Sequence, residues 1–510
     1  MKLDRTSMLY GTLVLTITGI ISQILGFVYR IFLSRLIGAE NMGLYQLVLP
    51  VYGCVLSIVS VGLSVSVSRL SAEYQALGNT RAVRQVLRKS LFYLALLFLL
   101  ISCVTVLMYD PISVHLLGDA RTQMSILLLL PCILLTGIEN IHKHYFYGTG
   151  QVRPPALVEL AEQLVRMFAV LALLVFFLPQ NNEVAVGLMV LGMVICELFS
   201  ALALSFLFRR RLKSGGTCKG DPLPSAALRR SIGKIALPVG INSLIGNLMS
   251  SANAVLIPQL LVAAGWSISE AMASFGVLFG MALPMLCLPF AFIGALCTVL
   301  VPKLAQSAAL GRTEEISQRV SKALLSTSVL VMPVLAILLI VGPTLGQVLF
   351  LEPMVGDYLP ALSIGVLFSC YQSVLGNALY GIGRQNAATV CSLVCDAVQL
   401  AFTYFGTSIP GVGLYGFIAG FVVSSAAGAV FNAVYFMRVT GMRPCYFTWI
   451  VSPGLSTILT FLCGRLLFQV LQDRGLAPMP SVLAVLLFGV ILYLSALYTQ
   501  GVRTESGIRP

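Results

Sequence analysis

Apolar runs of helix length follow one another along the whole chain of 510 residues. Crossing the hydrocarbon core of a bilayer takes about 20 apolar residues in an α-helix. A backbone in lipid must also satisfy its own polar groups, which a helix does. The expected spans are residues 9–36, 43–68, 90–109, 123–147, 155–178, 184–208, 232–261, 272–301, 323–350, 358–380, 386–409, 412–437, 446–470 and 480–499. The sequence therefore predicts an all-α polytopic membrane protein with about 14 transmembrane helices.

The composition and the placement of charges agree with this prediction. Hydrophobic residues make up 58% of the chain and charged residues 10%, whereas soluble domains carry about 25% charged residues. The net charge is +13, yet 26 of the 32 Lys and Arg residues lie at the termini or in every second loop. This positive-inside pattern predicts an inner-membrane protein with both termini in the cytoplasm, and it does not indicate a nucleic-acid partner. The six exceptions are Arg30, Arg35, Arg121, Arg166, Arg465 and Arg474.

Two short sequences recur in the second half of the chain, and both recur at the same interval. Tyr-Gly-Thr-Gly at 147–150 returns as Tyr-Gly-Ile-Gly at 380–383, and LGNTRAVRQVLRKSL from Leu77 returns as LGRTEEISQRVSKAL from Leu310. Six expected helices separate the copies, so both copies keep one orientation and the halves are expected to be related by a pseudo-two-fold axis along the membrane normal. We therefore expect two pseudo-symmetric six-helix lobes around a central cavity. The expected parts are an N-terminal lobe (1–210), a cytoplasmic linker loop (211–231), a C-terminal lobe (232–440) and two additional transmembrane helices (441–510).

Prolines inside the spans predict local bends, because each removes an intrahelical hydrogen bond. Pro284 and Pro289 follow Gly276 and Gly280 within the eighth span. This span is the best candidate for bending during transport.

Polar side chains are concentrated in the first half of the span at 155–178. Glu159, Glu162 and Arg166 are spaced i, i+3, i+7, so a helix places them on one stripe. Arg166 lies roughly 16 Å into this helix, where a charge costs at least about 2.5 kcal/mol and is expected to face a partner or a wet cavity. In one interpretation, Glu162 and Arg166 form an i,i+4 ion pair that fixes the helix. In the other, Arg166 binds an anionic head group while Glu162 and Gln163 orient it.

Other charged groups in the spans leave similar alternatives. Arg30 either lines the cavity or extends toward the outer interface. Glu197 and Asp396 lie near the midplane without an obvious local cation, and they are candidate coupling sites for a proton or Na⁺ unless helix packing satisfies them. Asp396 follows Gln163 by the interval of the repeat, so it is expected on the cavity-facing stripe of the second lobe.

The sequence favours neither a metal site nor an enzyme. His142 and His144 lie near Glu139, but two residues apart on a helix they point in different directions. Solvation at the membrane interface is the favoured interpretation for this group. No Walker loop is present, so ATP is not expected to drive the protein, and no cofactor is expected.

Several motifs resemble those of the polysaccharide and lipid-linked-oligosaccharide flippases of the MOP superfamily. They are ILGFVYRIFLSRLIGAENMGLYQ in the first span, SRLSAEY at 68–74, YGTG at 147–150 and EQLVR at 162–166. The similarity covers essentially the whole chain and is strongest to the stage V sporulation protein B branch, which is related to the lipid II flippases. The resemblance implies fourteen helices in two lobes that alternate access to a central cavity. It also implies an undecaprenyl-diphosphate-linked sugar as substrate, with Arg30, Glu162, Gln163 and Arg166 in the binding site.

The chain also departs from the pattern of the lipid II flippases. Gln23 stands at the position of an arginine in their first-span motif, and Gln399 stands where a basic residue is common in the eleventh span. The cavity is therefore expected to be less cationic, with Gln23 retained among the substrate-binding candidates.

These observations predict a flippase rather than an enzyme. Its substrate would be a polyprenyl-diphosphate-linked saccharide, a peptidoglycan precursor, with a role in the spore cortex as one case. The alternative is a cation-coupled multidrug exporter of the same superfamily, which would use Glu197 or Asp396. A third interpretation is an assembly scaffold for envelope synthases.

Overall fold

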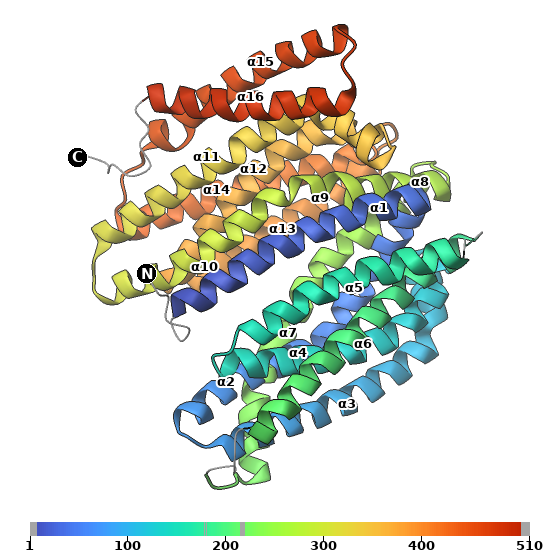
Figure 1. Cartoon of the computed structure of the whole chain (residues 1–510), viewed down its shortest axis with the longest axis vertical. Coiled ribbons are helices and arrows are strands. Elements are labelled where there is room, and N and C mark those ends of the chain that lie inside the picture. Colours follow the sequence, from blue (N-terminus) through green and yellow to red (C-terminus); the bar gives the residue numbers. More distant parts are fainter. Residues whose placement is uncertain (1–7, 178, 180, 215–219, 501–510) are drawn as a thin grey trace. The chain divides into compact units, whose positions relative to one another are not determined.

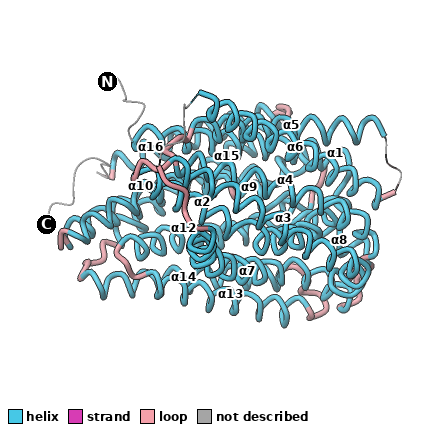
Figure 2. The backbone as a smooth tube through the Cα atoms, turned by 90° about the horizontal axis from the view of Figure 1, so that it is seen from below, coloured by secondary structure: helices cyan, strands magenta, loops and turns pink. Residues whose placement is uncertain are grey.

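The computed structural model describes residues 8–177, 179, 181–214 and 220–500. Every regular element in these ranges is helical, as Figure 2 shows. Fourteen helical segments among them are long and apolar enough to cross a membrane. The prediction of an all-α polytopic membrane protein with 14 spans is therefore confirmed. Residues 215–219 of the expected linker loop, and the terminal residues 1–7 and 501–510, lie outside the described residues.

The chain divides into two compact units, Met1–Gln259 with Ile268–Ala273, and Leu260–Ser267 with Ser274–Pro510. The lobe boundaries expected at residues 210, 231 and 440 stay predictions. The first unit contains α1 (Met8–Leu56), η1 (Ser57–Val61), α2 (Gly62–Ala76), α3 (Thr80–Pro111), η2 (Ile112–Leu117), η3 (Ala120–Thr122), α4 (Gln123–Gly148), α5 (Arg153–Phe177), α6 (Asn182–Ser214) and most of α7 (Ser225–Ala263). The α-helices are labelled in Figure 1. Helix α8 (Ile268–Gly276) is divided between the units. The second contains η4 (Val277–Ala282), α9 (Leu283–Leu286), α10 (Leu288–Ala309), α11 (Thr313–Leu345), η5 (Gly346–Phe350), α12 (Met354–Gly381), α13 (Gln385–Thr407), α14 (Tyr415–Thr440), η6 (Phe447–Val451), α15 (Ser452–Asp473) and α16 (Pro478–Thr499).

Two backbone irregularities interrupt the long helices. Gly38 has φ 76° and ψ 176° inside α1, a conformation that only glycine adopts readily, and it separates the first two expected spans. In the eighth span, the helix is interrupted by a turn at Cys287, between Pro284 and Pro289. Helix α9 therefore ends before Cys287 and α10 begins after it, and bending of this span during transport stays a prediction.

The sequence repeat has a counterpart in local geometry. Gly150 and Gly383, the last glycines of the two YGxG motifs, have φ 74° and 76°. Gly78 and Gly311 of the other motif have φ 71° and 68°. All four follow helix ends, where a left-handed residue closes the last turn. Helices α3 and α11 then begin at the equivalent threonines of the two copies, so the duplication extends from sequence to helix boundaries.

The last two helices pack within the second unit. Figure 1 shows α15 and α16 side by side, and both contact α11. Their shared apolar core contains Ile337, Ile340 and Val341 of α11 with Val482 and Val485 of α16. This packing gives α15 and α16 a structural role as a cover on α11.

Candidate functional site

The α5–α6 pair carries the most polar buried cluster of the described chain, and a glycine sets its spacing. A methyl group placed on Gly192 of α6 would stand 2.3 Å from Cγ2 of Val170 on α5. The two helices can approach this closely only because Gly192 has no side chain. Arg166 lies one turn before Val170 on α5, and Cys196 and Glu197 lie about one turn after Gly192 on α6. Arg166 therefore lies beside Cys196 and Glu197.

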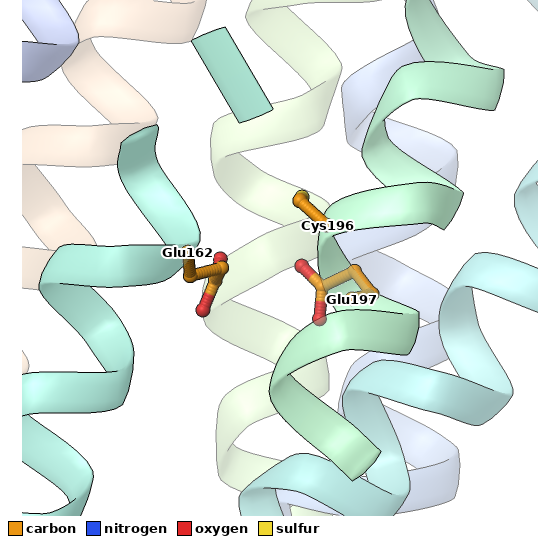
Figure 3. A group of neighbouring side chains, drawn as sticks. All are labelled: Glu162, Cys196 and Glu197. Carbon is orange, nitrogen blue, oxygen red and sulfur yellow. The ribbon is translucent and has the colours of Figure 1, made fainter. Parts of the chain in front are cut away.

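Arg166 is held by three side chains from two helices. Its Nη2 donates to Glu162 Oε1 at 2.5 Å and to Glu197 Oε1 at 3.4 Å, and its Nε donates to Cys196 Sγ at 3.3 Å. Figure 3 shows Glu162 on one helix facing Cys196 and Glu197 on the next. The predicted i,i+4 pair is confirmed, and Arg166 faces partners inside the protein as expected.

The cation beside Glu197 could not be seen in the local sequence, because Arg166 belongs to a different helix. Side chains of Glu197 and Glu162 are only 4% and 7% exposed, whereas Arg166 retains 22% exposure. One oxygen of Glu197, Oε2, is buried without a hydrogen-bond partner. Arg166 is therefore the accessible member of the group.

Helix α4 adds a second set of charges to this cluster. Lys143 Nζ lies 2.9 Å from Glu159 Oε2 and 3.8 Å from Glu139 Oε1. Glu139 is 4% exposed and interacts electrostatically with Glu162 and Glu197. The expectation that the Glu139 and His142 region is solvated at the interface is wrong. Both side chains are buried because α4 packs its polar stripe against α5 and α6.

The cluster contains more acidic than basic groups. Its four carboxylates, Glu139, Glu159, Glu162 and Glu197, meet only two cations, Lys143 and Arg166. Carboxylates this close repel one another at low dielectric, and cations nearby offset that repulsion. The arrangement can therefore take up a positive charge or, if Arg166 is released from its partners, an anion.

Glu162, Cys196 and Glu197 offer three ligand atoms within 4.8 Å of one another. Thiolate and carboxylate ligands of this kind suit a divalent cation. In this structure the guanidinium of Arg166 contacts all three, so a metal ion would compete with it.

Helix α1 lies in the same neighbourhood. Tyr29 and Tyr45 each interact electrostatically with both Arg30 and Arg166. Arg30 is partly exposed, and Gln23, two helical turns earlier on α1, is exposed. Gln163 is partly exposed beside Glu162 on α5. The structure thus brings Arg30 near Arg166, while the assignment of these residues to a substrate stays a prediction.

The equivalent positions of the second unit are mostly uncharged. In the register of the repeat, Cys395 and Gln399 take the places of Glu162 and Arg166, and Asp396 takes the place of Gln163. Asp396 is partly exposed on α13, and it takes part in none of the ion pairs of the described residues. The duplicated halves have therefore diverged in charge.

The second unit instead contains an apolar cavity of about 360 Å³. It lies between α11, α12 and α15, and Ser363 and Thr457 are the hydroxyl-bearing residues among its largely apolar lining. Helix α15 forms one wall, so at least one of the two C-terminal helices shapes a surface as well as covering α11.

The fold is that of the MOP-superfamily transporters. The chain superposes on an inward-facing multidrug resistance MATE family transporter with a TM-score of 0.67, at 15% identity over 82% of this chain and 94% of that one. Superposition on a MOP superfamily transporter from Pyrococcus furiosus gives a TM-score of 0.61 at 16% identity, over 86% of this chain and 97% of that one. At these identities the likeness concerns the fold alone.

Sequence comparison then identifies the family. The polysaccharide biosynthesis protein family matches residues 8–308, and the chain belongs to this family. The lipid II flippase MurJ family matches residues 240–472. Stage V sporulation protein B of Bacillus subtilis is 25% identical over 85% of this chain and 84% of its own length. Lipid II flippase MurJ of the same organism is 24% identical, over 84% of this chain and 82% of its own length. The recognised resemblance is confirmed, and at family level the chain is related to flippases, which are in general not enzymes.

Proposed function

We propose that this protein is a bacterial inner-membrane flippase for a polyprenyl-diphosphate-linked saccharide. The saccharide is a peptidoglycan precursor, and the protein moves it to the outer leaflet by alternating access, with both termini in the cytoplasm. Arg166 and Arg30 bind the diphosphate, while Glu162, Gln163 and Gln23 orient it or accept hydrogen bonds from sugar hydroxyls. The family relationship and the buried charge cluster support this proposal.

The state of Arg166 is the observation that carries it. This guanidinium lies deep in an apolar helix, where an arginine without a function is disfavoured, and its side chain is still 22% exposed. A guanidinium presents paired donors that match phosphate oxygens. Arg30 shares its electrostatic neighbourhood, which suits a diphosphate because that group carries more than one charge.

The carboxylates supply a coupling device in this proposal. Diphosphate binding requires Arg166 to exchange Glu162 and Glu197 for phosphate oxygens, and the two carboxylates then need protons or Na⁺ for balance. Glu197, which interacts with both Arg166 and Glu139, is the main ion-coupling candidate, and Asp396 serves the second lobe. The membrane potential adds about 2.3 kcal/mol per net charge per 100 mV for an anion moving outward.

The lipid tail of the substrate needs an apolar surface. The cavity between α11, α12 and α15 has the required chemistry, because Leu335, Leu367 and Phe461 are among its lining residues. A polyprenyl chain would gain about 25 cal/mol per Å² of apolar surface removed from water.

The direct test is flipping of a fluorescent undecaprenyl-diphosphate saccharide in reconstituted vesicles. Wild type is expected to expose the label to an external quencher, and Arg166→Ala to slow exposure on the order of tenfold or more, which equals about 1.4 kcal/mol or more. Arg230→Ala, which removes an exposed arginine of α7, is the matched control and should leave the rate unchanged. Wild-type rates in Arg166→Ala vesicles would remove Arg166 from the site.

One observation favours the alternative of a cation-coupled multidrug exporter, in which the same fold would bind organic cations. The α4–α6 cluster has two more carboxylates than cations. On this alternative, cells carrying the protein resist cationic dyes and lose resistance on Asp396→Asn or Glu197→Gln. Absence of any resistance, combined with saccharide flipping in vesicles, would decide for the flippase.

A further inference from the structure

A basic cavity lies on the first unit, separate from the Arg166 cluster. Its volume is about 490 Å³. Helix α3 contributes Arg84, Arg88 and Leu91, and helices α4 and α6 contribute His142 and Arg209 among others. All of these positions belong to the first compact unit, so the cavity is complete within it.

The cavity is polar at one end and apolar along the rest of its length. Arg84 and Arg88 are one turn apart on α3, and the apolar lining continues along the same face of the helix through Leu91, Leu94 and Ala95. Gly137 of α4 lets Leu94 pack closely against that helix, since a methyl group there would stand 2.6 Å from Leu94 Cδ1. The result is a cationic mouth with an apolar groove leading away from it.

The cations of the mouth lack protein counter-charges. None of the ion pairs of the described residues includes Arg84, Arg88 or Arg209, and no described residue lining the cavity is acidic. The Nε of Arg84 is buried without a hydrogen-bond partner. The His142 ring does not neutralise them, because its Nδ1–H donates to the Ile138 carbonyl at 2.8 Å and a neutral or protonated ring adds no negative charge. The site therefore presents unsatisfied donors that an anion would fill.

Helix α3 exposes an apolar face along this groove. Its exposed side chains include Phe92, Leu96, Leu99 and Leu100, each more than half exposed, as expected for a surface against acyl chains. Arg84 and Arg88 belong to the basic stretch at 77–89, at the beginning of α3, which the positive-inside pattern assigns to the cytoplasmic face. The mouth then lies at head-group depth and the groove at acyl depth.

We propose that this cavity is a binding site for an anionic glycerophospholipid of the cytoplasmic leaflet, of the phosphatidylglycerol class. Arg84, Arg88 and Arg209 bind the phosphodiester, and one acyl chain lies along Leu91, Leu94 and Leu134. Basic pockets between transmembrane helices on the cytoplasmic side recognise anionic head groups in this way. The bound lipid fixes α3 against α4 and α6, which makes the first unit sensitive to bilayer composition. This proposal does not depend on which substrate the protein moves.

The test is lipid retention by the purified full-length protein in detergent, measured by native mass spectrometry. Phosphatidylglycerol and phosphatidylcholine are added at equal concentration to wild type, Arg88→Gln/Arg209→Gln and Arg81→Gln/Arg230→Gln. Both double variants remove two exposed arginines of the first unit, but only the first pair lines the cavity. We expect the first pair to lower phosphatidylglycerol retention on the order of tenfold, and the second pair to leave it within about twofold.

A second variant tests the groove without altering charge. Ala95→Trp adds bulk to an exposed position of the apolar lining and is expected to lower phosphatidylglycerol retention with all three arginines present. A diazirine-bearing phosphatidylglycerol should crosslink to peptides of α3, α4 or α6. Three results would overturn the proposal: equal retention of the two lipids by wild type, equal loss in both arginine pairs, or crosslinks confined to the second unit. Competition by glycerol 1-phosphate as strong as that by the intact lipid would also overturn it, because the acyl groove would then contribute nothing.

Discussion

Arg166 and Glu197 are separated by 31 residues in the chain, and their Nη2 and Oε1 atoms lie 3.4 Å apart. This contact joins two helices, whereas the shorter contact of Arg166 with Glu162 stays within one helix. A ligand that takes Arg166 away from Glu197 therefore changes how α5 is held against α6. That link between ligand binding and helix packing is what an alternating-access protein requires.

Gly192 is expected to be essential for this arrangement. Gly192→Val would drive α6 away from Val170, since even a single methyl group would stand 2.3 Å from Cγ2 of that residue. Overpacking of this kind costs about 1–3 kcal/mol, so the thermal midpoint in detergent should fall and transport should be lost. Gly233→Ala on α7 is the control, because nothing lies within 4 Å of its added methyl group. An unchanged midpoint for Gly192→Val would show that the helices can separate freely.

Removal of Arg166 is expected to destabilise the protein through the acids it leaves behind. Arg166→Gln strands Glu162 and Glu197, which are 7% and 4% exposed. Breaking a buried pair on one side costs about 3–5 kcal/mol, and Arg166→Gln/Glu162→Gln should recover part of that loss. Chemical unfolding of the purified protein in detergent measures the difference.

The Glu315–Arg319 pair of α11 has the same i,i+4 order but is about one-third exposed on both sides. Arg319→Gln should therefore change stability by no more than about 1 kcal/mol. If the Arg166→Gln/Glu162→Gln variant is stable but inactive, at least one of these two side chains acts on substrate. If the double variant regains both stability and flipping, the ion pair is purely structural.

Much of the fold could be predicted from the sequence because the bilayer imposes one length on every span. The helix starts were less well predicted. Helix α3 begins at Thr80 and α11 at Thr313, well before the expected spans at 90 and 323. The first turns of both helices are rich in polar and charged residues, so hydropathy excludes them although they are helical. Helix boundaries follow backbone hydrogen bonding and capping, which do not stop at the membrane surface.

In the site, contacts within one helix could be predicted from the sequence, whereas contacts between helices could not. The Glu162–Arg166 pair follows from spacing within one helix, whereas Glu197 and Glu139 reach the cluster from α6 and α4. One signal was present in the sequence. Helices α5 and α6 are joined by a connection of a few residues, which makes them antiparallel neighbours, and Arg166 and Glu197 lie at similar distances from it. Lys143 offered no comparable signal for its pairing with Glu159.

The repeat predicts opposite effects of substitution at two equivalent turns. Leu351 has φ 59°, and Gly118, which occupies the equivalent position in the first copy of the repeat, has φ 77°. Left-handed backbone costs about 1–2 kcal/mol for a residue with a Cβ. Because the Leu351 side chain is 67% exposed, Leu351→Gly should raise the free energy of unfolding by roughly 0.5–1 kcal/mol. Gly118→Ala should lower it by about 1–2 kcal/mol, since its methyl group would also stand 3.2 Å from the Gln259 side chain. Shifts of the same sign at both turns would contradict this account.

The orientation of the chain can be tested at the hairpin of the last two helices. Arg474 lies in the turn between α15 and α16, and Arg443 lies in the connection before η6. Both side chains are exposed. The positive-inside pattern assigns Arg443 to the cytoplasm and Arg474, one of the six exceptions, to the outside. In a cysteine-free background, a membrane-impermeant maleimide added to intact cells, with the outer layers made permeable, should label Arg474→Cys. It should label Arg443→Cys only after the inner membrane is opened. The reverse labelling pattern would place both termini outside the cell. It would contradict the proposed orientation, in which the end of the protein that carries the termini faces the cytoplasm.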